Sequence, residues 1–210
     1  MICSHNGIFN FEIILQGKPA HSSQPSWGIN TITDAMKIIQ VIQSFAKEQE
    51  TTIDSLLAQD HQDAFTTINV AAIQGGTAYN IIPERSIIKV SMRPIPKANI
   101  NALTRELTAR ILNTATKSKV STKISTKVPS LSTGQNTTLE KDLCQHAKTK
   151  HSSAVAYATD GAHLQLMGMK PIVFGAGSIA QAHKPNEYIK ANALIVFVPK
   201  LIQIVKRACC

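Results

Sequence analysis

The order of the hydrophobic patterns over residues 8–128 is the feature that most constrains the fold of this chain. β-branched and aromatic residues mark four strands, and apolar residues at helical spacing mark two helices between them. We expect a strand, a helix, two strands, a helix and a strand at 8–16, 31–49, 66–74, 84–93, 98–116 and 119–128. This βαββαβ order predicts a ferredoxin-like unit, in which an antiparallel sheet carries two helices on one face.

The last of these strands has a basic face. Lys119, Lys123 and Lys127 occupy odd positions, whereas Val120 and Ile124 occupy even positions. Successive side chains of a strand point to opposite faces of the sheet. We therefore expect one solvated face that carries all three lysines and one face that is partly buried.

Residues 129–210 show a different pattern, in which short strands alternate with helices. We expect helices at about 137–150, 160–167 and 191–207, with Pro199 at a start or kink, and strands at 154–157 and 171–174. Such alternation is typical of a parallel α/β sheet, which binds ligands where its strands end, so we expect chemistry in the loop at 175–187. The few elements make a thin core, so we interpret this part as a portion of a larger domain.

Composition argues against several other classes of protein. The formal net charge is +9, from 22 Lys and Arg against 13 Asp and Glu, but the basic residues are scattered and only 5% of residues are aromatic. Few platforms for base stacking are available, and we expect no nucleic-acid partner. No apolar run is long enough to span a membrane. The four cysteines show no paired spacing, which favours a location in the reducing cytoplasm.

Four loops beside predicted strands carry polar residues suited to chemistry. They are GKPAHSS at 17–23, GGTAYNIIP at 75–83, MRPIP at 92–96 and GAGSIAQAHKPNEY at 175–188. Binding and catalytic residues gather in loops on a rigid scaffold. Taken singly, each loop also has a structural interpretation: Gly75 and Gly76 could form only a hairpin turn, and His21 could be a surface residue.

In this order and spacing, the four loops resemble the dinuclear-metal aminoacylase/carboxypeptidase superfamily, and the last loop most resembles its acetylornithine deacetylase members. The resemblance covers nearly all 210 residues. It implies that residues 5–128 form a ferredoxin-like dimerisation lid, followed at 129–210 by the C-terminal part of a zinc-peptidase-like α/β catalytic domain. It also implies a homodimer formed through the lid, and metal-dependent hydrolysis of an N-acylated amino acid such as N-acetylornithine.

The resemblance assigns a role to each matching residue. His21 would polarise the scissile carbonyl of a substrate held by the other protomer of the dimer. Arg93 would bind the substrate carboxylate through its planar fork. His183 would be a ligand of zinc or cobalt. The remaining matches would line the substrate site: Asn80, Gly175, Gly177 and Ser178.

Most of the metal ligands of this family match nothing in the chain. A dinuclear centre needs about five or six protein side chains and a base for the bridging water. The Glu-Glu pair that supplies this base in the family is absent from the sequence. His61 and Asp63 have the spacing of a ligand pair, but they lie between the first helix and the second strand of the lid. We interpret them as part of a solvated connection.

We therefore expect this chain, as part of an acetylornithine deacetylase-like amidohydrolase, to be inactive alone. Two alternatives remain open. The chain could be half of a split enzyme that a separately encoded N-terminal half completes, or it could be a non-catalytic dimerisation module. Departures from the family pattern at Ser91, Ala176 and Asn186 hint at relaxed constraint.

Overall fold

The computed structural model describes residues 1–133, 137–147, 149–150 and 152–209. The strands are β1 Ile2–His5, β2 Ile8–Gln16, β3 Thr67–Gly75, β4 Arg85–Arg93, β5 Lys119–Val128, β6 Leu131–Ser132 and β7 Ser153–Val155. The α-helices are α1 Thr31–Gln49, α2 Ile100–Leu112, α3 Thr138–Ala147, α4 Gly161–Leu166 and α5 Ala191–Cys209. Short 3₁₀ helices cover Pro25–Trp27, Leu57–Gln59 and Ile179–Gln181.

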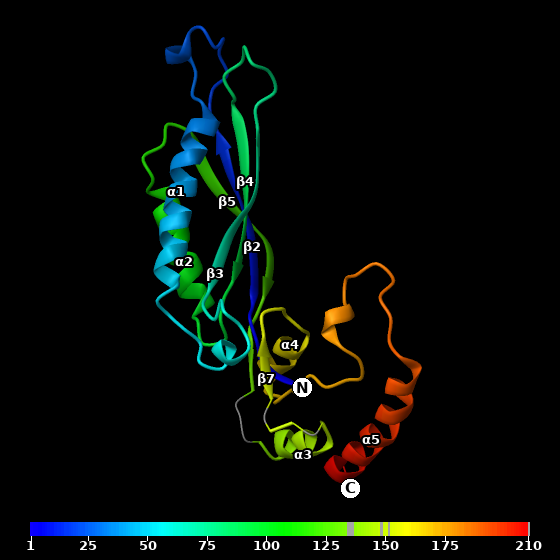
Figure 1. Cartoon of the computed structure of the whole chain (residues 1–210). Coiled ribbons are helices and arrows are strands. Elements are labelled where there is room, and N and C mark those ends of the chain that lie inside the picture. Colours follow the sequence, from blue (N-terminus) through cyan, green and yellow to red (C-terminus); the bar gives the residue numbers. More distant parts are fainter. Residues whose placement is uncertain (134–136, 148, 151, 210) are drawn as a thin grey trace.

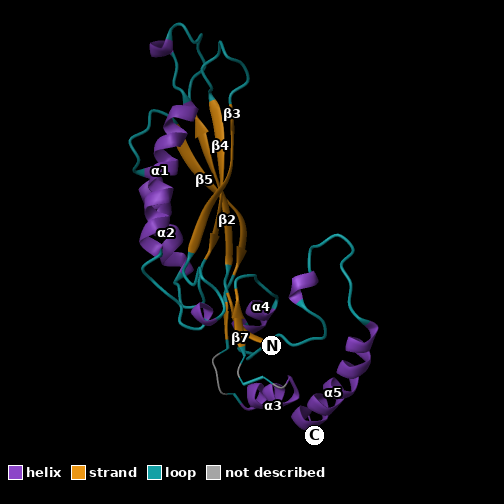
Figure 2. Cartoon of the chain, in the orientation of Figure 1, coloured by secondary structure: helices purple, strands orange, loops and turns teal. Residues whose placement is uncertain are grey.

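The first sheet is antiparallel, with four strands in the order β3-β4-β2-β5. We keep the name lid for this sheet and the two helices packed on it, within residues 8–128. α1 and α2 pack on one face of this sheet, and the other face is open (Figures 1 and 2). The predicted βαββαβ order is therefore confirmed, and the bounds of α1 and β5 agree with the predicted ranges.

The core of the lid lies between the sheet and its two helices. Every second side chain of β2 from Phe9 to Leu15 is buried against the helices. Asn30 and Asn99 cap α1 and α2, because their side-chain oxygens accept hydrogen bonds from the first free backbone N–H groups. The cluster contains Phe9, Phe11, Ile13, Leu15, Ala35, Ile38, Ile42, Phe45, Ile88, Val90, Met92, Leu107 and Ile111.

Asp34, in the first turn of α1, ties this helix to the loop before β5. Its Oδ2 accepts hydrogen bonds from the Ser118 N–H at 2.8 Å, the Ser118 hydroxyl at 2.8 Å and the Lys117 N–H at 3.0 Å. Its Oδ1 lies 3.1 Å from the Lys37 Nζ. Burial alone would raise the pKa of Asp34, but these hydrogen bonds, chiefly those from Ser118, hold it below its usual range.

Each edge strand of the lid sheet carries a β-bulge. Ser125 is the extra residue of β5, and Ala71 is the extra residue of β3. The bulge in β5 reverses the alternation of side chains, so that Lys127 turns to the helix side and donates to the Asn101 Oδ1 at 2.8 Å. The prediction that all three lysines share one face is therefore wrong for Lys127. Ile124, at 61% exposure, is also less buried than its position predicts.

The second sheet contains three short strands in the order β6-β1-β7. β1 pairs parallel with β7 and antiparallel with β6, so the sheet is mixed rather than purely parallel. The strand predicted at 171–174 does not form. Only Val173 pairs, through two backbone hydrogen bonds to Ile2 of 2.8 and 2.9 Å.

The chain passes between the two sheets at two adjacent points. It enters the lid at Asn6 and Gly7, and it returns at Pro129 and Ser130. A Cβ atom on Gly7 would lie 2.9 Å from the Val128 carbonyl oxygen, so the two crossing segments touch there. β1 includes His5, which places this residue in the second sheet. The domain division at residues 128 and 129 stays a prediction.

The last helix, α5, lies beside α3 and away from both sheets (Figure 1). Arg207 pairs with Asp142 of α3 at 3.0 Å, and Phe197 packs against Phe174 with the ring centres 5.2 Å apart. Pro199 lies inside this helix rather than at its start. In the described part of the chain, no helix is both long and apolar enough to cross a membrane.

Candidate functional site at the lid tip

Two loops meet at the end of the lid farthest from the termini (Figure 1). We call them together the lid tip, defined as residues 17–30 after β2 and 76–84 between β3 and β4. Backbone hydrogen bonds hold the loops together: the Ser22 N–H donates to the Asn80 carbonyl at 2.9 Å, and the Ile82 N–H donates to the Ala20 carbonyl at 2.8 Å. The structure therefore brings His21 and Asn80, which are distant in sequence, into one place.

The imidazole of His21 is exposed but held by its own loop. Its Nδ1 lies 2.7 Å from the Ser23 Oγ and accepts a hydrogen bond from the Ser23 N–H at 3.2 Å. The His21 carbonyl in turn accepts from the Gln24 N–H at 2.9 Å. Sequence reasoning missed Ser23, although a hydroxyl two residues after a histidine in a turn is a visible signal.

The lid tip also presents aromatic side chains that sequence reasoning did not single out. Trp27 is 64% exposed, and Tyr79, next to Asn80, is fully exposed. Trp and Tyr are enriched where protein surfaces meet, because each combines a large apolar area with a polar group. Their exposure gives the tip the character of a contact surface.

Arg93 lies at the opposite end of the lid from His21 and Asn80. It ends β4, whereas the tip loops adjoin the start of this strand. Nine strand residues span about 27 Å, so one copy of the chain does not bring Arg93 to its own lid tip. Arg93 is half-buried and pairs in the sheet with Thr67.

The loop at 175–190 contains the other predicted residues. Gly177 and Ser178 line a hollow of about 360 Å³ together with Gln181, Tyr188 and Lys190. Gly177 has a φ of +98°, a conformation that only glycine adopts without strain. Gly175 lies earlier in the loop, with no atom within 4 Å of the place where a Cβ would stand.

His183 is exposed on this loop. Its backbone N–H donates to the Glu187 Oε2 at 3.1 Å, a contact that sequence reasoning missed. Among the described residues, no three His, Cys, Asp or Glu side chains form a group that could hold a metal ion. A catalytic zinc needs about three protein ligands, so the residues present do not fit a complete metal centre.

His61 is not near these residues. Its Nε2 lies 3.2 Å from the Ala154 carbonyl oxygen of β7, so the imidazole connects the lid to the second sheet. Asp63 is exposed. This arrangement agrees with a structural connection rather than a ligand pair.

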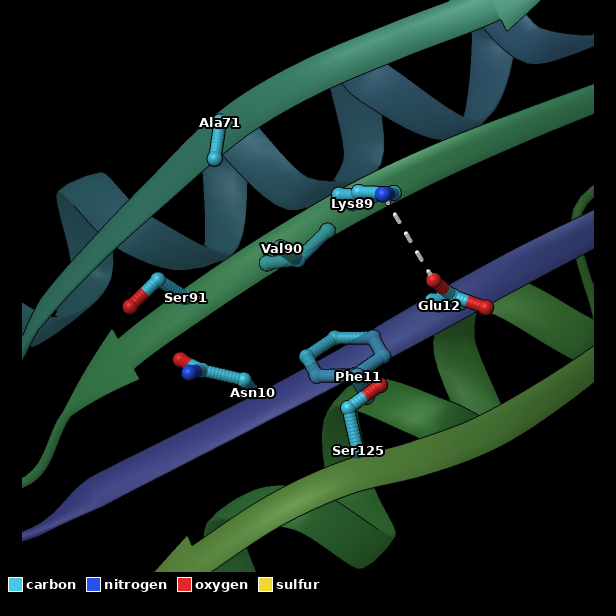
Figure 3. Close-up of a pocket in the computed structure, with 8 residues that line it drawn as sticks. All are labelled: Asn10, Phe11, Glu12, Ala71, Lys89, Val90, Ser91 and Ser125. Atoms are coloured by element: carbon cyan, nitrogen blue, oxygen red, sulfur yellow. Dashed lines mark ion pairs between the residues drawn. The ribbon is translucent and has the colours of Figure 1, made fainter.

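A second hollow, of about 310 Å³, lies on the open face of the lid sheet (Figure 3). Both bulge residues, Ala71 and Ser125, line it, and Asn10 and Ser91 lie side by side at one end. A Lys89–Glu12 ion pair of 3.9 Å lies at the other end. None of the predicted site residues lines this hollow.

Comparison with known proteins places the chain in a family. The family described as the peptidase dimerisation domain matches residues 3–119, which is more than half of the chain. The chain therefore belongs to this family.

Among curated proteins, the chain is similar to acetylornithine deacetylases. It is 27% identical to the enzyme of Myxococcus xanthus over 201 residues, a match that covers 94% of this chain and 52% of the relative. It is 28% identical to that of Buchnera aphidicola over 199 residues, covering 90% of this chain and 49% of the relative. The chain thus spans about half the length of these relatives. The resemblance seen in the sequence is confirmed.

Solved structures show the same fold. A tripeptidase from Staphylococcus aureus superposes with a TM-score of 0.74 at 20% identity, covering 98% of this chain and 52% of that one. A metallo-carboxypeptidase from Sulfolobus solfataricus superposes with a TM-score of 0.72 at 17% identity, covering 98% and 59%. At these identities the likeness concerns the fold alone, and it supports the predicted mixed α/β architecture.

Proposed function

We propose that this chain is the lid and C-terminal part of a metal-dependent amidohydrolase of the acetylornithine deacetylase type, and that it is inactive alone. The similarity to acetylornithine deacetylases supports the reaction, hydrolysis of an N-acylated amino acid such as N-acetylornithine. The lack of a three-residue ligand group among the described residues supports the inactivity. His183 would contribute one ligand to zinc or cobalt, and the other ligands would come from a segment outside this sequence.

The observation that carries the proposal is the separation of the site residues into two sets. His21 and Asn80 are held together at the lid tip, and Arg93 lies about 27 Å away at the other end of the sheet. A substrate bound by Arg93 and the loop at 175–187 is therefore out of reach of the tip of the same copy. A homodimer formed through the lid would bring the tip of one protomer to the Arg93 of the other.

In this arrangement each residue would act on a defined part of the substrate. Arg93 would bind the carboxylate through its guanidinium fork. His21 would donate a hydrogen bond to the scissile carbonyl as it gains negative charge, and Asn80 would contact the substrate. Gly177 and Ser178 would line the pocket.

The test uses the purified chain and a fusion. We expect the chain alone, with zinc or cobalt added, to bind no stoichiometric pair of ions and to release no acetate from N-acetylornithine. Joining it to the part of the Myxococcus xanthus enzyme that it does not match should restore both properties. A chain that hydrolyses the substrate alone would contradict the proposed inactivity. A folded, metal-loaded fusion without activity would contradict the proposed reaction.

A second candidate is favoured by the exposed apolar surface of α5. Its residues Ile195, Val198 and Ile202 are at least half exposed, although the apolar residues of a helix normally face the core. A separately encoded N-terminal half that completes the catalytic domain would cover them. Co-expression of such a half should yield a stable complex in which these residues are protected from solvent.

If co-expression yields no complex while the chain alone forms dimers, a non-catalytic dimerisation module becomes the better description. Cys3 and Cys144 are free and buried, which suits a reducing compartment. We keep the cytoplasm as the proposed location, with no nucleic-acid partner.

A further inference from the structure

We infer that Ser23 is a positioning residue that fixes the imidazole of His21 in the tautomer with its hydrogen on Nε2. This inference rests on the role proposed above for His21. It follows from the contacts of the two ring nitrogens, which differ sharply. Nδ1 meets two groups of Ser23, whereas Nε2 is on the other side of the ring of a residue that is exposed at the lid tip.

The backbone contact shows which nitrogen bears the hydrogen, and the hydroxyl adds the shorter of the two contacts to Nδ1. The Ser23 N–H can only donate, and it points to Nδ1 at 3.2 Å, so Nδ1 must offer a lone pair. The Ser23 hydroxyl, 2.7 Å from the same nitrogen, can either donate or accept, and it donates in this tautomer. A hydrogen on Nδ1 would instead face the Ser23 N–H and lose that hydrogen bond.

The surrounding loop keeps Ser23 in place. On one side, the Ser22 N–H is bound to the Asn80 carbonyl at 2.9 Å, and on the other, the Gln24 N–H is bound to the His21 carbonyl at 2.9 Å. The backbone on both sides of Ser23 is therefore fixed before any substrate arrives. A donor that is already oriented costs no reorganisation when charge develops on a carbonyl oxygen.

This tautomer has a chemical consequence for the reaction. A carbonyl that gains negative charge needs an N–H donor, and a bare nitrogen would repel it. With Nδ1 occupied by Ser23, the neutral imidazole offers its N–H at Nε2, the nitrogen that can face a substrate. Ser23 thus acts through His21 and does not itself touch the substrate.

Nuclear magnetic resonance of the chain labelled with ¹⁵N-histidine tests the inference without any enzyme activity. The chemical shifts of the two ring nitrogens of His21, at about pH 8.5 where imidazole is neutral, give the ratio of the tautomers. The ratio of the Nε2–H form to the Nδ1–H form should be roughly fivefold higher in the chain than in a free peptide with the sequence of this loop. A roughly fivefold change is the effect of one hydrogen bond. Ser23→Ala should lower this ratio toward that of the peptide, because the hydroxyl is lost.

Ser22→Ala is the matched control, since it removes the neighbouring hydroxyl and should leave the ratio unchanged. A native ratio equal to that of the peptide, or a ratio that Ser23→Ala does not move, would overturn the inference. In an active fusion, Ser23→Ala should lower kcat roughly fivefold with little change in KM, and Ser23→Thr should restore it. An inactive fusion contradicts only the proposed reaction, because the tautomer is measured separately.

Discussion

At the scale of single residues, two buried titratable groups hold the elements of this chain together in opposite ways. Asp34 is charged in the folded state and gathers donors from its own helix and from the loop before β5. His5 is neutral: its Nδ1 donates to the Asn6 carbonyl at 2.8 Å, and its Nε2 accepts from the Thr159 N–H at 3.1 Å. Burial lowers the pKa of His5 below its usual range.

Asp34→Asn should destabilise the lid by about 2 kcal/mol, because a buried carboxylate with four donors loses its charge-assisted hydrogen bonds. Urea denaturation measures this loss, and Asp63→Asn, at an exposed position, should change little. The pKa of Asp34 is lower in the folded state. Its contribution is therefore complete above about pH 4 and is lost as the pH falls below that value.

His5 should also make the free energy of unfolding decrease as the pH falls, but at a higher pH than Asp34 does. Because the pKa of His5 is lower in the folded state, the unfolded chain takes up a proton first as the pH falls through about 6.5. The free energy of unfolding should therefore decrease between about pH 7 and pH 5. His5→Gln should flatten this slope, whereas His163→Gln, at an exposed position, should not. An unchanged slope in His5→Gln would assign the effect to other groups.

At the scale of the elements, hydrophobic periodicity predicts helices and strands that depend on neighbouring residues. It fails for strands whose pairing partners lie far along the chain. The range of α1 was predicted from apolar residues at helical spacing within one segment of sequence, and the structure shows that Ile38, Ile42 and Phe45 are the buried ones. β1 was not predicted, because four residues carry too little pattern and its partners lie far along the chain. The bulge at Ser125 has no local signal either, yet it decides the side on which Lys127 lies.

The candidate site follows the same rule. Its residues come from the four loop motifs taken together with the family resemblance, and their roles stay predictions. Their arrangement was not readable. That His21 and Asn80 share one tip, while Arg93 lies at the far end of the sheet, depends on the direction of β2 and β4.

Gly17, at the start of the first tip loop, should tolerate no side chain. A Cβ atom there would lie 2.2 Å from the Ile29 carbonyl oxygen, where the two sides of the first tip loop pair. Gly17→Ala should therefore lower the melting temperature by several degrees, corresponding to about 1–3 kcal/mol. Gly175→Ala is the matched control, because nothing lies within 4 Å of its Cβ position. Equal stability of the two variants would contradict the close approach.

At the scale of the whole molecule, the described part of the chain joins a well-packed lid to a thinner second part. The lid has a core with residues from both helices and the sheet. The second part leaves Leu166, Met167 and much of α5 exposed. Exposed apolar patches of this kind are typical of surfaces that contact another protein or a ligand.

Charged substitutions can distinguish the face of α5 that packs against the protein from the face that is exposed. Ile195 and Ile202 are 67% and 50% exposed, so the double variant Ile195→Glu/Ile202→Glu should keep its thermal stability and bind less of a hydrophobic dye. Ile204, at 5% exposure, faces the protein, and Ile204→Glu should unfold this part of the chain. Equal damage from both variants would show that the outer face is already packed.

The two adjacent crossing points at Gly7 and Ser130 set the order in which the molecule can assemble during synthesis. β1 leaves the ribosome before the lid, but its partners in β6 come much later: the Leu131 carbonyl that accepts from the Ser4 hydroxyl lies 127 positions further along the chain. The lid can fold as soon as β5 has emerged, because all of its partners are then present. β1 therefore stays unpaired until the folded lid holds its own first and last residues close together. Folding of the lid thus brings the distant strands of the second sheet close enough to pair.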